Sequence, residues 1–419
     1  MKELQEIVWN LSALSVYRGL LDCPVTGSFY RLLKQAARFN IDDPQPFFAA
    51  WGEFFSTACA HGAEENLSGV ITDGALYDDN IFSRQGAAGE PVSTALRQAV
   101  ERDLSILRSA VCLTPEQILA QSGAGELTLS HTLPKWQTGE PVAELQGDLS
   151  GCVDRLWTFY RTHGCGKFVK YRAFIWRDQQ ILPVEYPDKV TLSDLKGYDY
   201  QRNLVVENTT LFLKGLPANN CLLYGDRGTG KSSTVKAIMN DYAHCGLRVI
   251  EMPKESLMEF PYLVDQIAGL PLKFLIFIDD LSFSKQDETY ASLKAVLEGG
   301  VAARPDNTLI YATSNRRHLL RETFSDREGD EIHRGDTIQE SLSLADRFGL
   351  TVNFSHPDKA QYLALITAMA EKRGLLDYLP ELKRGAEEWA LTRGGRSPRC
   401  ATQYMDQAEA KIRAGDTNL

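Results

Sequence analysis

The sequence predicts an α/β protein: a parallel β-sheet covered by helices, preceded by a mainly helical region and followed by a helical segment. Three observations support this prediction. After residue 197, short apolar runs alternate with stretches long enough for helices, which is typical of a parallel sheet buried on both faces. Up to about residue 120, apolar residues recur at three- and four-residue steps, as on one face of a helix. From residue 358 onward, the sequence favours helices alone.

The N-terminal region is expected to form a mainly helical domain over residues 1–145, because the stretches 4–21 and 94–111 both have helical periodicity. Residues 121–141 are rich in Gly, Ser, Thr and Pro and are interpreted as a connector. Residues 146–187 are expected to form a second connector with strand-like segments, since they contain many aromatic and β-branched residues.

Five apolar runs are predicted to be the strands of the sheet, and the first four are each followed by room for a helix. These runs are NCLLYGD (220–226), LRVIEMP (247–253), KFLIFIDD (273–280), NTLIYATSN (307–315) and LTVNFSH (350–356). Beyond them, Asp358 and Ser397 are good N-caps for two helices, and Gly374 is expected to end the first of these helices.

The loop after the first of these runs carries the pattern G-x-x-x-x-G-K-[ST] between a strand and a helix. Its glycines let the backbone curl so that successive N–H groups point at phosphate oxygens, and the helix N-terminus adds a positive dipole. A chance glycine turn rarely comes with both flanking elements. The predicted nucleotide-binding residues are Gly225, Asp226, Arg227, Gly228, Thr229, Gly230, Lys231, Ser232 and Ser233.

Within this loop, Lys231 is expected to neutralise the β- and γ-phosphates of a nucleotide, and Ser232 to ligate Mg²⁺. The matching acids should end a later strand, and Asp279 and Asp280 do so. Asp279 is expected to hold Mg²⁺ through water, and Asp280 to act as the base or water-positioning carboxylate. A polar strand end is the simpler explanation of such a pair when it occurs alone.

The stretch 190–355 resembles an AAA+ ATPase core, and more closely a bacterial AAA+-type family known as domain of unknown function 815. The residues that carry the resemblance are LKGYDYQRN (195–203), NTTLFLKGLPANNCLLYGDRGTGKSS (208–233), FLIFIDDLSF (274–283), YATSNRRHL (311–319) and SLADRFGL (343–350). The resemblance implies a five-stranded parallel sheet of order 5-1-4-3-2 in an ATP-binding core over residues 188–356. It also implies a helical lid over residues 357–419.

The resemblance also implies roles for single residues. Asn315 matches the sensor 1 residue that places the attacking water, although Asn is also a common turn residue. Arg347 matches the arginine that AAA+ subunits insert into a neighbour's site, although a surface ion pair is the simpler explanation. Arg399 matches the sensor 2 arginine of the lid, with Arg396 as the alternative. Val190, Leu192, Leu195 and Gly197 lie where AAA+ proteins build the adenine pocket.

The sequence departs from the AAA+ pattern in two places. AAA+ proteins usually have Asp-Glu where this chain has Asp279-Asp280, so the second carboxylate stands about 1.5 Å further from the water and slow turnover is expected. Residues 316–336 form a densely charged insertion, interpreted as a solvated loop or, alternatively, as a partner-sensing or pore loop.

Composition narrows the class of protein. The formal net charge of −10 argues against a surface built for non-specific DNA binding. The stretch 161–177 interleaves basic and aromatic residues, which can bind single-stranded nucleic acid. Alternation of this kind is also typical of an edge strand, and we favour that interpretation.

No run of about 18 apolar residues and no secretory signal are found. The eight cysteines form no Cys-x-x-Cys pair, as expected for a cytoplasmic protein with reduced thiols.

Three functions are therefore considered. The first is Mg²⁺-dependent ATP hydrolysis in a homo-oligomer that remodels a protein partner bound by the N-terminal domain. The second is a nucleotide-gated binding switch with little turnover. The third is a loader or remodeller acting on DNA, for which the sequence supplies no clear basic face.

Overall fold

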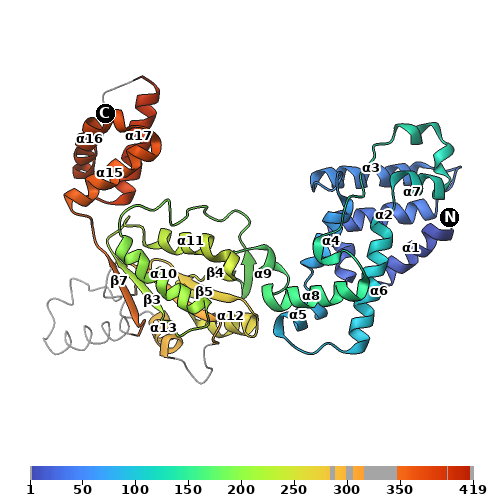
Figure 1. Ribbon diagram of the computed structural model, residues 1–419, viewed down its shortest axis with the longest axis horizontal. Coiled ribbons are helices and arrows are strands. Elements are labelled where there is room, and N and C mark those ends of the chain that lie inside the picture. The colour runs from blue at the N-terminus through green and yellow to red at the C-terminus, as the bar shows by residue number, and fades with distance from the viewer. Residues whose placement is uncertain (1, 284–287, 299–304, 316–346, 394, 416–419) are drawn as a thin grey trace. The chain divides into compact units, whose positions relative to one another are not determined.

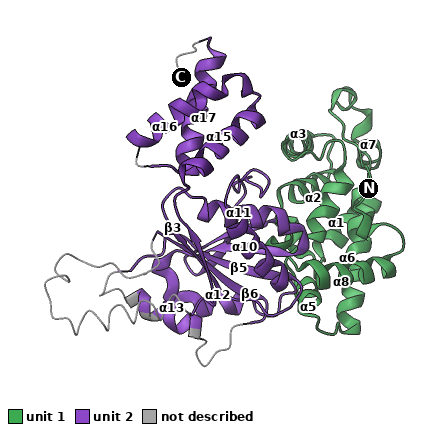
Figure 2. Ribbon diagram, turned by 60° about the vertical axis from the view of Figure 1, so that its left-hand side comes forward, with its two compact units in different colours: residues 1–170 green, residues 171–419 purple. Residues whose placement is uncertain are grey.

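In the computed structural model, the described residues are 2–283, 288–298, 305–315, 347–393 and 395–415. The chain divides into two compact units, residues 1–170 and 171–419, which are coloured separately in Figure 2. This division lies inside the stretch 146–187 that the sequence predicts to be a connector. The predicted domain boundaries at residues 145, 187 and 356 stay predictions.

The first unit is built from helices (Figure 1). The stretch 94–111, predicted from its periodicity, is the helix α6, and Ser93 caps it by accepting from the backbone N–H of Leu96. The periodic stretch 4–21 is an α-helix only as far as Ser12. The α-helices of this unit are α1 (Lys2–Ser12), α2 (Pro24–Ala37), α3 (Gln45–Ala60), α4 (Leu67–Leu76), α5 (Ile81–Ala88), α6 (Thr94–Val111), α7 (Pro115–Ser122), α8 (Leu149–His163) and α9 (Lys167–Lys170); the 3-10 turns are η1 (Arg18–Asp22), η2 (Ala124–Glu126), η3 (Thr128–Thr132) and η4 (Ala143–Leu145).

Residues 121–141, interpreted from composition as a connector, pack into the core of the first unit instead. Trp136 is only 4% exposed, and its ring lies 4.7 Å from that of Phe54 and 5.0 Å from that of Trp51. The Trp51 indole N–H in turn donates to the carbonyl of Pro134 at 2.9 Å. Composition failed here because one buried tryptophan outweighs many small polar neighbours in apolar area.

The second unit contains one sheet of seven strands, in the order β2-β1-β4-β5-β6-β3-β7. The prediction of five strands was therefore wrong in number. Five of the seven, taken as β7-β3-β6-β5-β4, do follow the order 5-1-4-3-2 and are parallel. The strands are β1 (Ala173–Arg177), β2 (Gln180–Pro183), β3 (Cys221–Gly225), β4 (Leu247–Glu251), β5 (Lys273–Ile278), β6 (Thr308–Ser314) and β7 (Leu350–Phe354).

The two additional strands come from the basic and aromatic stretch and the residues after it. β1 pairs parallel to β4, and β2 pairs antiparallel to β1, so β2 and not β1 is the edge strand. The aromatic residues explain the pairing, because Phe174 and Trp176 are each 1% exposed and would otherwise face water. The Trp176 indole N–H donates to Glu259 at 2.6 Å.

Helices cover both faces of the sheet. Alternate strand residues, including Leu223, Leu275 and Tyr311, pack with α10 and α11 in one buried cluster. Figure 1 shows α12 and α13 on the opposite side of the sheet. The helical elements before the lid are α10 (Asp199–Leu213), α11 (Lys231–Tyr242), α12 (Phe260–Ile267), α13 (Glu288–Glu298) and the 3-10 turns η5 (Ala243–Cys245) and η6 (Lys254–Glu259).

The three-helix segment after β7, called the lid below, has its own apolar core. Two of its three α-helices start at the predicted caps. Asp358 accepts from the N–H of Gln361 at 2.8 Å, and Ser397 accepts from that of Cys400 at 3.2 Å. The elements of the lid are α15 (Lys359–Arg373), η8 (Leu376–Tyr378), α16 (Leu379–Thr392) and α17 (Pro398–Arg413), and α15 ends at Gly374 in the left-handed conformation.

Candidate functional site

The glycine-rich loop between β3 and α11 has the backbone of an anion-binding loop. Gly225, Gly228 and Gly230 have φ values of 129°, 75° and 93°, which residues with a Cβ rarely adopt. At Gly225 a Cβ would also lie 2.3 Å from the carbonyl oxygen of Phe354 on β7. Glycine is therefore required where the loop leaves the sheet, and the amino end of α11 follows directly.

Lys231 lies at the start of α11 and is 7% exposed. Its ammonium donates to the carbonyls of Gly225 at 2.8 Å and Asp226 at 2.7 Å, and to the Asn315 side chain at 3.3 Å. Burial lowers the pKa of Lys231 below its usual value, and the nearby carboxylates of the site oppose that change. The cation is thus held by acceptors of its own loop, within reach of any anion that the loop binds.

Ser232 and Asp279 form the second part of the site. The Ser232 hydroxyl donates to Asp279 Oδ1 at 2.7 Å, and Thr313 also donates to this oxygen. Side-chain alternation in β5 and β6 explains why Asp279 and Thr313 are in contact. Asp279 lies on the same face of the sheet as Phe277, and Thr313 lies on the same face as Tyr311. A hydroxyl that donates to a carboxylate keeps lone pairs free for a metal ion, and the carboxylate can also accept from water bound to that ion. The pair therefore fits a Mg²⁺ ion that keeps several waters.

Asp280 follows Asp279 in a left-handed turn, with φ of 50°. Alternation alone would point its side chain to the other face of the sheet. The turn is held because the Asp280 N–H donates to Thr313 Oγ1 at 2.9 Å, and the carboxylate then accepts from Asn315 Nδ2 at 2.6 Å. Asn315 therefore bridges Lys231 and Asp280. Uncommon backbone conformations of this type concentrate at functional sites.

These residues line one cavity of about 700 Å³, a size in the usual range for small-molecule sites. From the lid, Arg399 lines the same cavity. Arg396 does not, because its guanidinium pairs with both carboxylate oxygens of Glu387 at 2.9 Å. Of the two arginines that the sequence left open, only Arg399 thus lines this cavity, and its role as sensor 2 stays a prediction. The cavity is lined by Leu195, Arg227, Gly228, Thr229, Gly230, Lys231, Ser232, Ser233, Asp279, Asp280, Thr313, Asn315, Pro398, Arg399, Thr402 and Gln403.

Three of the four residues expected at an adenine pocket lie in a neighbouring cavity. Leu192, Leu195 and Gly197 line it together with residues of α10 and α15, and Leu195 lines the phosphate-loop cavity as well. Val190 lines neither, and its carbonyl accepts from Asn240 on α11 at 2.7 Å. The segment before α10 has no regular strand here, contrary to its local pattern.

Arg347 lies at the other end of the sheet. Leu350 pairs with Cys221 and Phe354 with Gly225, so the start of β7, which Arg347 precedes, lies roughly 13 Å along the strand from the glycine-rich loop. Arg347 therefore does not line the cavity of its own chain. The charged insertion 316–336 lies outside the described residues.

Two contributors to the site were missed from the sequence. Thr313, which contacts both aspartates, lies two positions before Asn315 and therefore on the same face of β6, a signal that strand alternation could have given. The second is His356, whose backbone N–H donates to the Asp226 carboxylate at 2.7 Å. These two residues are 130 positions apart, and no local pattern connects them.

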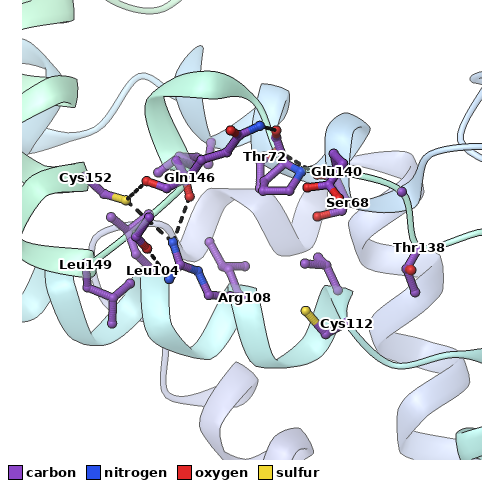
Figure 3. Close-up of a pocket in the computed structure, with 17 residues that line it drawn as sticks. Ser68, Thr72, Leu104, Arg108, Cys112, Thr138, Glu140, Gln146, Leu149 and Cys152 are labelled. Atoms are coloured by element: carbon purple, nitrogen blue, oxygen red, sulfur yellow. Dashed lines mark hydrogen bonds between the residues drawn. The ribbon is translucent and has the colours of Figure 1, made fainter.

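A different cavity, of about 400 Å³, lies in the first unit (Figure 3). Its one arginine, Arg108, donates to the carbonyls of Leu145 at 2.8 Å and Gly147 at 2.6 Å. Thr72 accepts from the backbone N–H of Val142 at 3.0 Å. Arg108 and Thr72 thus hold the segment 138–149 over α4 and α6.

The basic and aromatic stretch offers little for stacking bases. Phe174 and Trp176 are buried in β1, and Phe168 is 8% exposed. Among the described residues, no helix is long and apolar enough to cross a membrane. The same residues hold no cluster of three or more His, Cys, Asp or Glu side chains suited to a metal ion.

Comparison with protein families gives a match over residues 169–412 to the family described as "Protein of unknown function (DUF815)". The chain belongs to this family. The match spans the sheet, the glycine-rich loop and most of the lid, and with the strand order it identifies an AAA+ P-loop architecture. The resemblance inferred from the sequence is confirmed at this level.

Among curated proteins, the chain is 25% identical over 212 residues to the 26S proteasome regulatory subunit 6B homolog of Encephalitozoon cuniculi, covering 45% of this chain and 50% of that protein. It is 24% identical over 213 residues to the probable 26S proteasome regulatory subunit 6B of Caenorhabditis elegans, covering 48% of this chain and 50% of that protein. The chain thus spans about half the length of the curated relatives it matches.

Among solved structures, AMPPCP-bound DnaA from Aquifex aeolicus is similar with 16% identity and a TM-score of 0.38, covering 54% of this chain and 67% of that one. The RuvB Holliday junction branch migration motor of Thermotoga maritima is similar with 13% identity and a TM-score of 0.31, covering 52% and 72%.

Proposed function

We propose that the chain binds Mg²⁺–ATP in the cavity at the carboxyl end of the sheet and hydrolyses it. The observation that carries this proposal is the convergence on one cavity of three kinds of group. These are a buried ammonium on a glycine-rich loop, two carboxylates at a strand end, and an arginine from the lid. Each matches a part that phosphoryl transfer requires.

In the bound state, the N–H groups of the loop and the Lys231 ammonium hold the β- and γ-phosphates. Ser232 and Asp279 would hold Mg²⁺, which would supply neutralisation of charge on the phosphate oxygens. Leu192, Leu195 and Gly197 offer an apolar surface for adenine next to the phosphate cavity. Arg399 faces the phosphates from the lid.

Asp280 is the residue that orients the attacking water and accepts its proton, with Asn315 holding one oxygen of the carboxylate. Arg347 completes the site of a neighbouring subunit, because its place at the amino end of β7 keeps it from its own site. A homo-oligomer follows, in which turnover drives remodelling of a protein partner bound by the first unit. We propose the cytoplasm as its compartment.

A nucleotide-gated switch with little turnover is the second candidate, and the short Asp280 side chain supports it. Here ATP would order the lid over the cavity without rapid hydrolysis. DNA remodelling is not proposed, because aromatic residues of the basic stretch are buried.

The test is ATP turnover against protein concentration, with Lys231→Ala as the blank. Specific activity that rises with concentration supports shared active sites. Arg347→Ala is expected to keep nucleotide affinity and lose turnover about 1,000-fold. Mixing the Lys231→Ala and Arg347→Ala proteins should restore activity, since one subunit supplies the intact site and its neighbour supplies Arg347. Two inactive proteins that stay inactive when mixed, although they co-assemble, would rule out the shared site.

A further inference from the structure

The loop that is proposed to bind phosphate is joined to the lid by a side chain that the ATP-binding pattern leaves unspecified. Asp226 is the second residue of the loop. Its carboxylate accepts from the backbone N–H of His356 at 2.7 Å, and its own N–H donates to the carbonyl of Phe354 at 3.0 Å. His356 lies in the short segment 355–358, called the hinge below, which leads from β7 into the lid, so Asp226 holds the end of β7 and the first part of this hinge.

The hinge is joined in turn to the start of α17. His356 Nδ1 lies 2.7 Å from the carbonyl oxygen of Arg396. Because a carbonyl can only accept, Nδ1 carries the proton and donates. Arg396 immediately precedes Ser397, the N-cap of α17. The orientation of this helix therefore depends on the position of the hinge imidazole.

The start of α17 returns to the glycine-rich loop and closes a ring of contacts. The N–H of Arg399 donates to the carbonyl of Gly228 at 3.1 Å. A side chain at Gly228 would be tightly placed, since a Cβ would lie 3.0 Å from Arg399 Cβ and 3.1 Å from Ser397 Oγ, and the φ of 75° also disfavours one. The loop thus touches the lid at two places: at Asp226 through the hinge, and at Gly228 through α17 directly.

We propose that Asp226 and His356 form a link that positions Arg399 over the phosphates, with Asp226 as a positioning residue rather than a ligand. This inference rests on the proposed nucleotide binding. Lys231 makes this link sensitive to bound phosphate, because its ammonium donates to the Asp226 carbonyl at 2.7 Å. Phosphates that recruit this ammonium release the carbonyl of the residue that holds the hinge. Asp226 therefore connects phosphate binding at the loop with the orientation of the lid.

The substitutions Asp226→Ala and Asp226→Asn separate the link from other roles. Asparagine keeps an oxygen that accepts from the His356 N–H but loses the charge, whereas alanine loses both. We expect Asp226→Ala to raise the Kd of a non-hydrolysable ATP analogue with Mg²⁺ about 5- to 10-fold, and Asp226→Asn to raise it less than about 3-fold. His356→Ala removes the bond to the Arg396 carbonyl and the approach of Nε2 to the Asp226 carboxylate at 4.0 Å, but it keeps the backbone N–H that Asp226 accepts from, and it should raise Kd by an intermediate factor.

The decisive experiment is a double-mutant cycle with Arg399→Ala, on proteins whose folding is checked by circular dichroism. If Asp226 acts through Arg399, adding Asp226→Ala to Arg399→Ala changes Kd less than about 2-fold. Independent, multiplicative effects, or equal effects of the alanine and asparagine variants, would overturn the proposal.

Hydrogen exchange of the His356 amide in nucleotide-free protein tests the link without any ligand. Exchange should be faster in Asp226→Ala than in Asp226→Asn and the unsubstituted protein. Unchanged exchange in the alanine variant contradicts the link, whatever the nucleotide does. Absence of analogue binding by the unsubstituted protein, with the expected exchange pattern, would instead contradict the proposed function and leave the contact between loop and hinge in place.

Discussion

Each unit of the molecule has a cavity in which a basic side chain donates to backbone carbonyls of a loop, yet the two cavities are built for different purposes. In the first unit, Arg108 holds the segment 138–149, and its donors are directed at that segment. In the second, Lys231 donates to its own glycine-rich loop and stands beside two carboxylates and Asn315. The same kind of bond holds a loop in one place, and in the other it holds the cation that the proposed function assigns to phosphate.

The difference lies in what surrounds the cation. A guanidinium whose planar fork satisfies two carbonyls gains nothing by leaving them. An ammonium at the amino end of a helix, on a loop whose glycines turn N–H groups outward, gains more from a phosphate than from the carbonyls. A cavity with a buried cation therefore becomes a candidate site only when the neighbouring backbone also favours an anion.

The largest effect is expected from Lys231→Ala. Removing the ammonium should weaken binding of Mg²⁺–ATP on the order of 100-fold or more, since charge-assisted bonds contribute about 1.5–3 kcal/mol each. Isothermal titration calorimetry measures this loss. Lys236→Ala, on the same helix but 41% exposed and 4.0 Å from Asp188, is the matched control and should leave Kd unchanged. Equal Kd values for Lys231→Ala and Lys236→Ala would mean that the Lys231 ammonium does not bind the nucleotide, and the proposed difference between the two cavities would be wrong.

The next effect separates an enzyme from a switch. Asp280→Asn keeps the shape of the side chain and its turn but removes the carboxylate that takes the proton, so turnover should fall about 100-fold or more while Kd stays within about 3-fold. Single-turnover measurements with radiolabelled ATP give both quantities. If turnover of the unsubstituted protein is already at background and Asp280→Asn changes nothing, the switch is the better description.

Asp280→Glu sharpens this prediction. AAA+ proteins usually have the longer side chain, so a faster rate would mean that the short carboxylate limits turnover. A slower rate would mean that the left-handed turn at Asp280 already compensates for the missing methylene.

Much of the second cavity could be predicted from the sequence because its chemistry lies in short local patterns. The loop, the strand-end acids and the lid caps each follow from a few adjacent residues, whereas Asn315 was implied by the resemblance to AAA+ proteins. Thr313 needed only strand alternation. Asp226 and His356 could not be paired, because the hydrogen bond joins a side chain to a backbone N–H, and any residue but proline supplies that donor.

The rest of the fold could not be predicted because its signals are spread over distant residues. β1 and β2 extend the sheet through Phe174 and Trp176, whose pattern favours an edge strand but is also compatible with a nucleic-acid surface until burial is known. The cavity of the first unit is lined by residues scattered between 68 and 152, and no two of its polar groups form a motif.

Arg108→Ala tests the structural side of the comparison. Loss of the bonds from its guanidinium to two carbonyls and to the Cys152 sulfur should destabilise the first unit by roughly 1.5–3 kcal/mol and speed hydrogen exchange in residues 138–149. Arg97→Ala on the same helix removes exposed ion pairs and one long bond to the Ser150 carbonyl at 3.5 Å, and should cost less than about 1 kcal/mol. Nucleotide affinity should be the same in both variants. A weakened Kd in Arg108→Ala alone would show that the two cavities are coupled.

The smallest effect concerns the ion pair between Asp194, in the segment before α10, and Lys372 of the lid, whose atoms lie 2.7 Å apart. Hydrogen bonds from Lys372 and from Thr191 lower the pKa of the Asp194 carboxyl. A carboxyl whose pKa is lowered on folding stabilises the fold above its unfolded pKa, and this contribution is lost as pH falls through the folded value. Since both side chains are exposed, Lys372→Ala should lower the free energy of unfolding, measured by urea denaturation at pH 7, by less than about 1 kcal/mol. This loss of stability should shrink with added salt and disappear at pH values where the carboxyl is protonated. A larger, salt-independent loss would mean that this contact, rather than the hinge, holds the lid against the sheet.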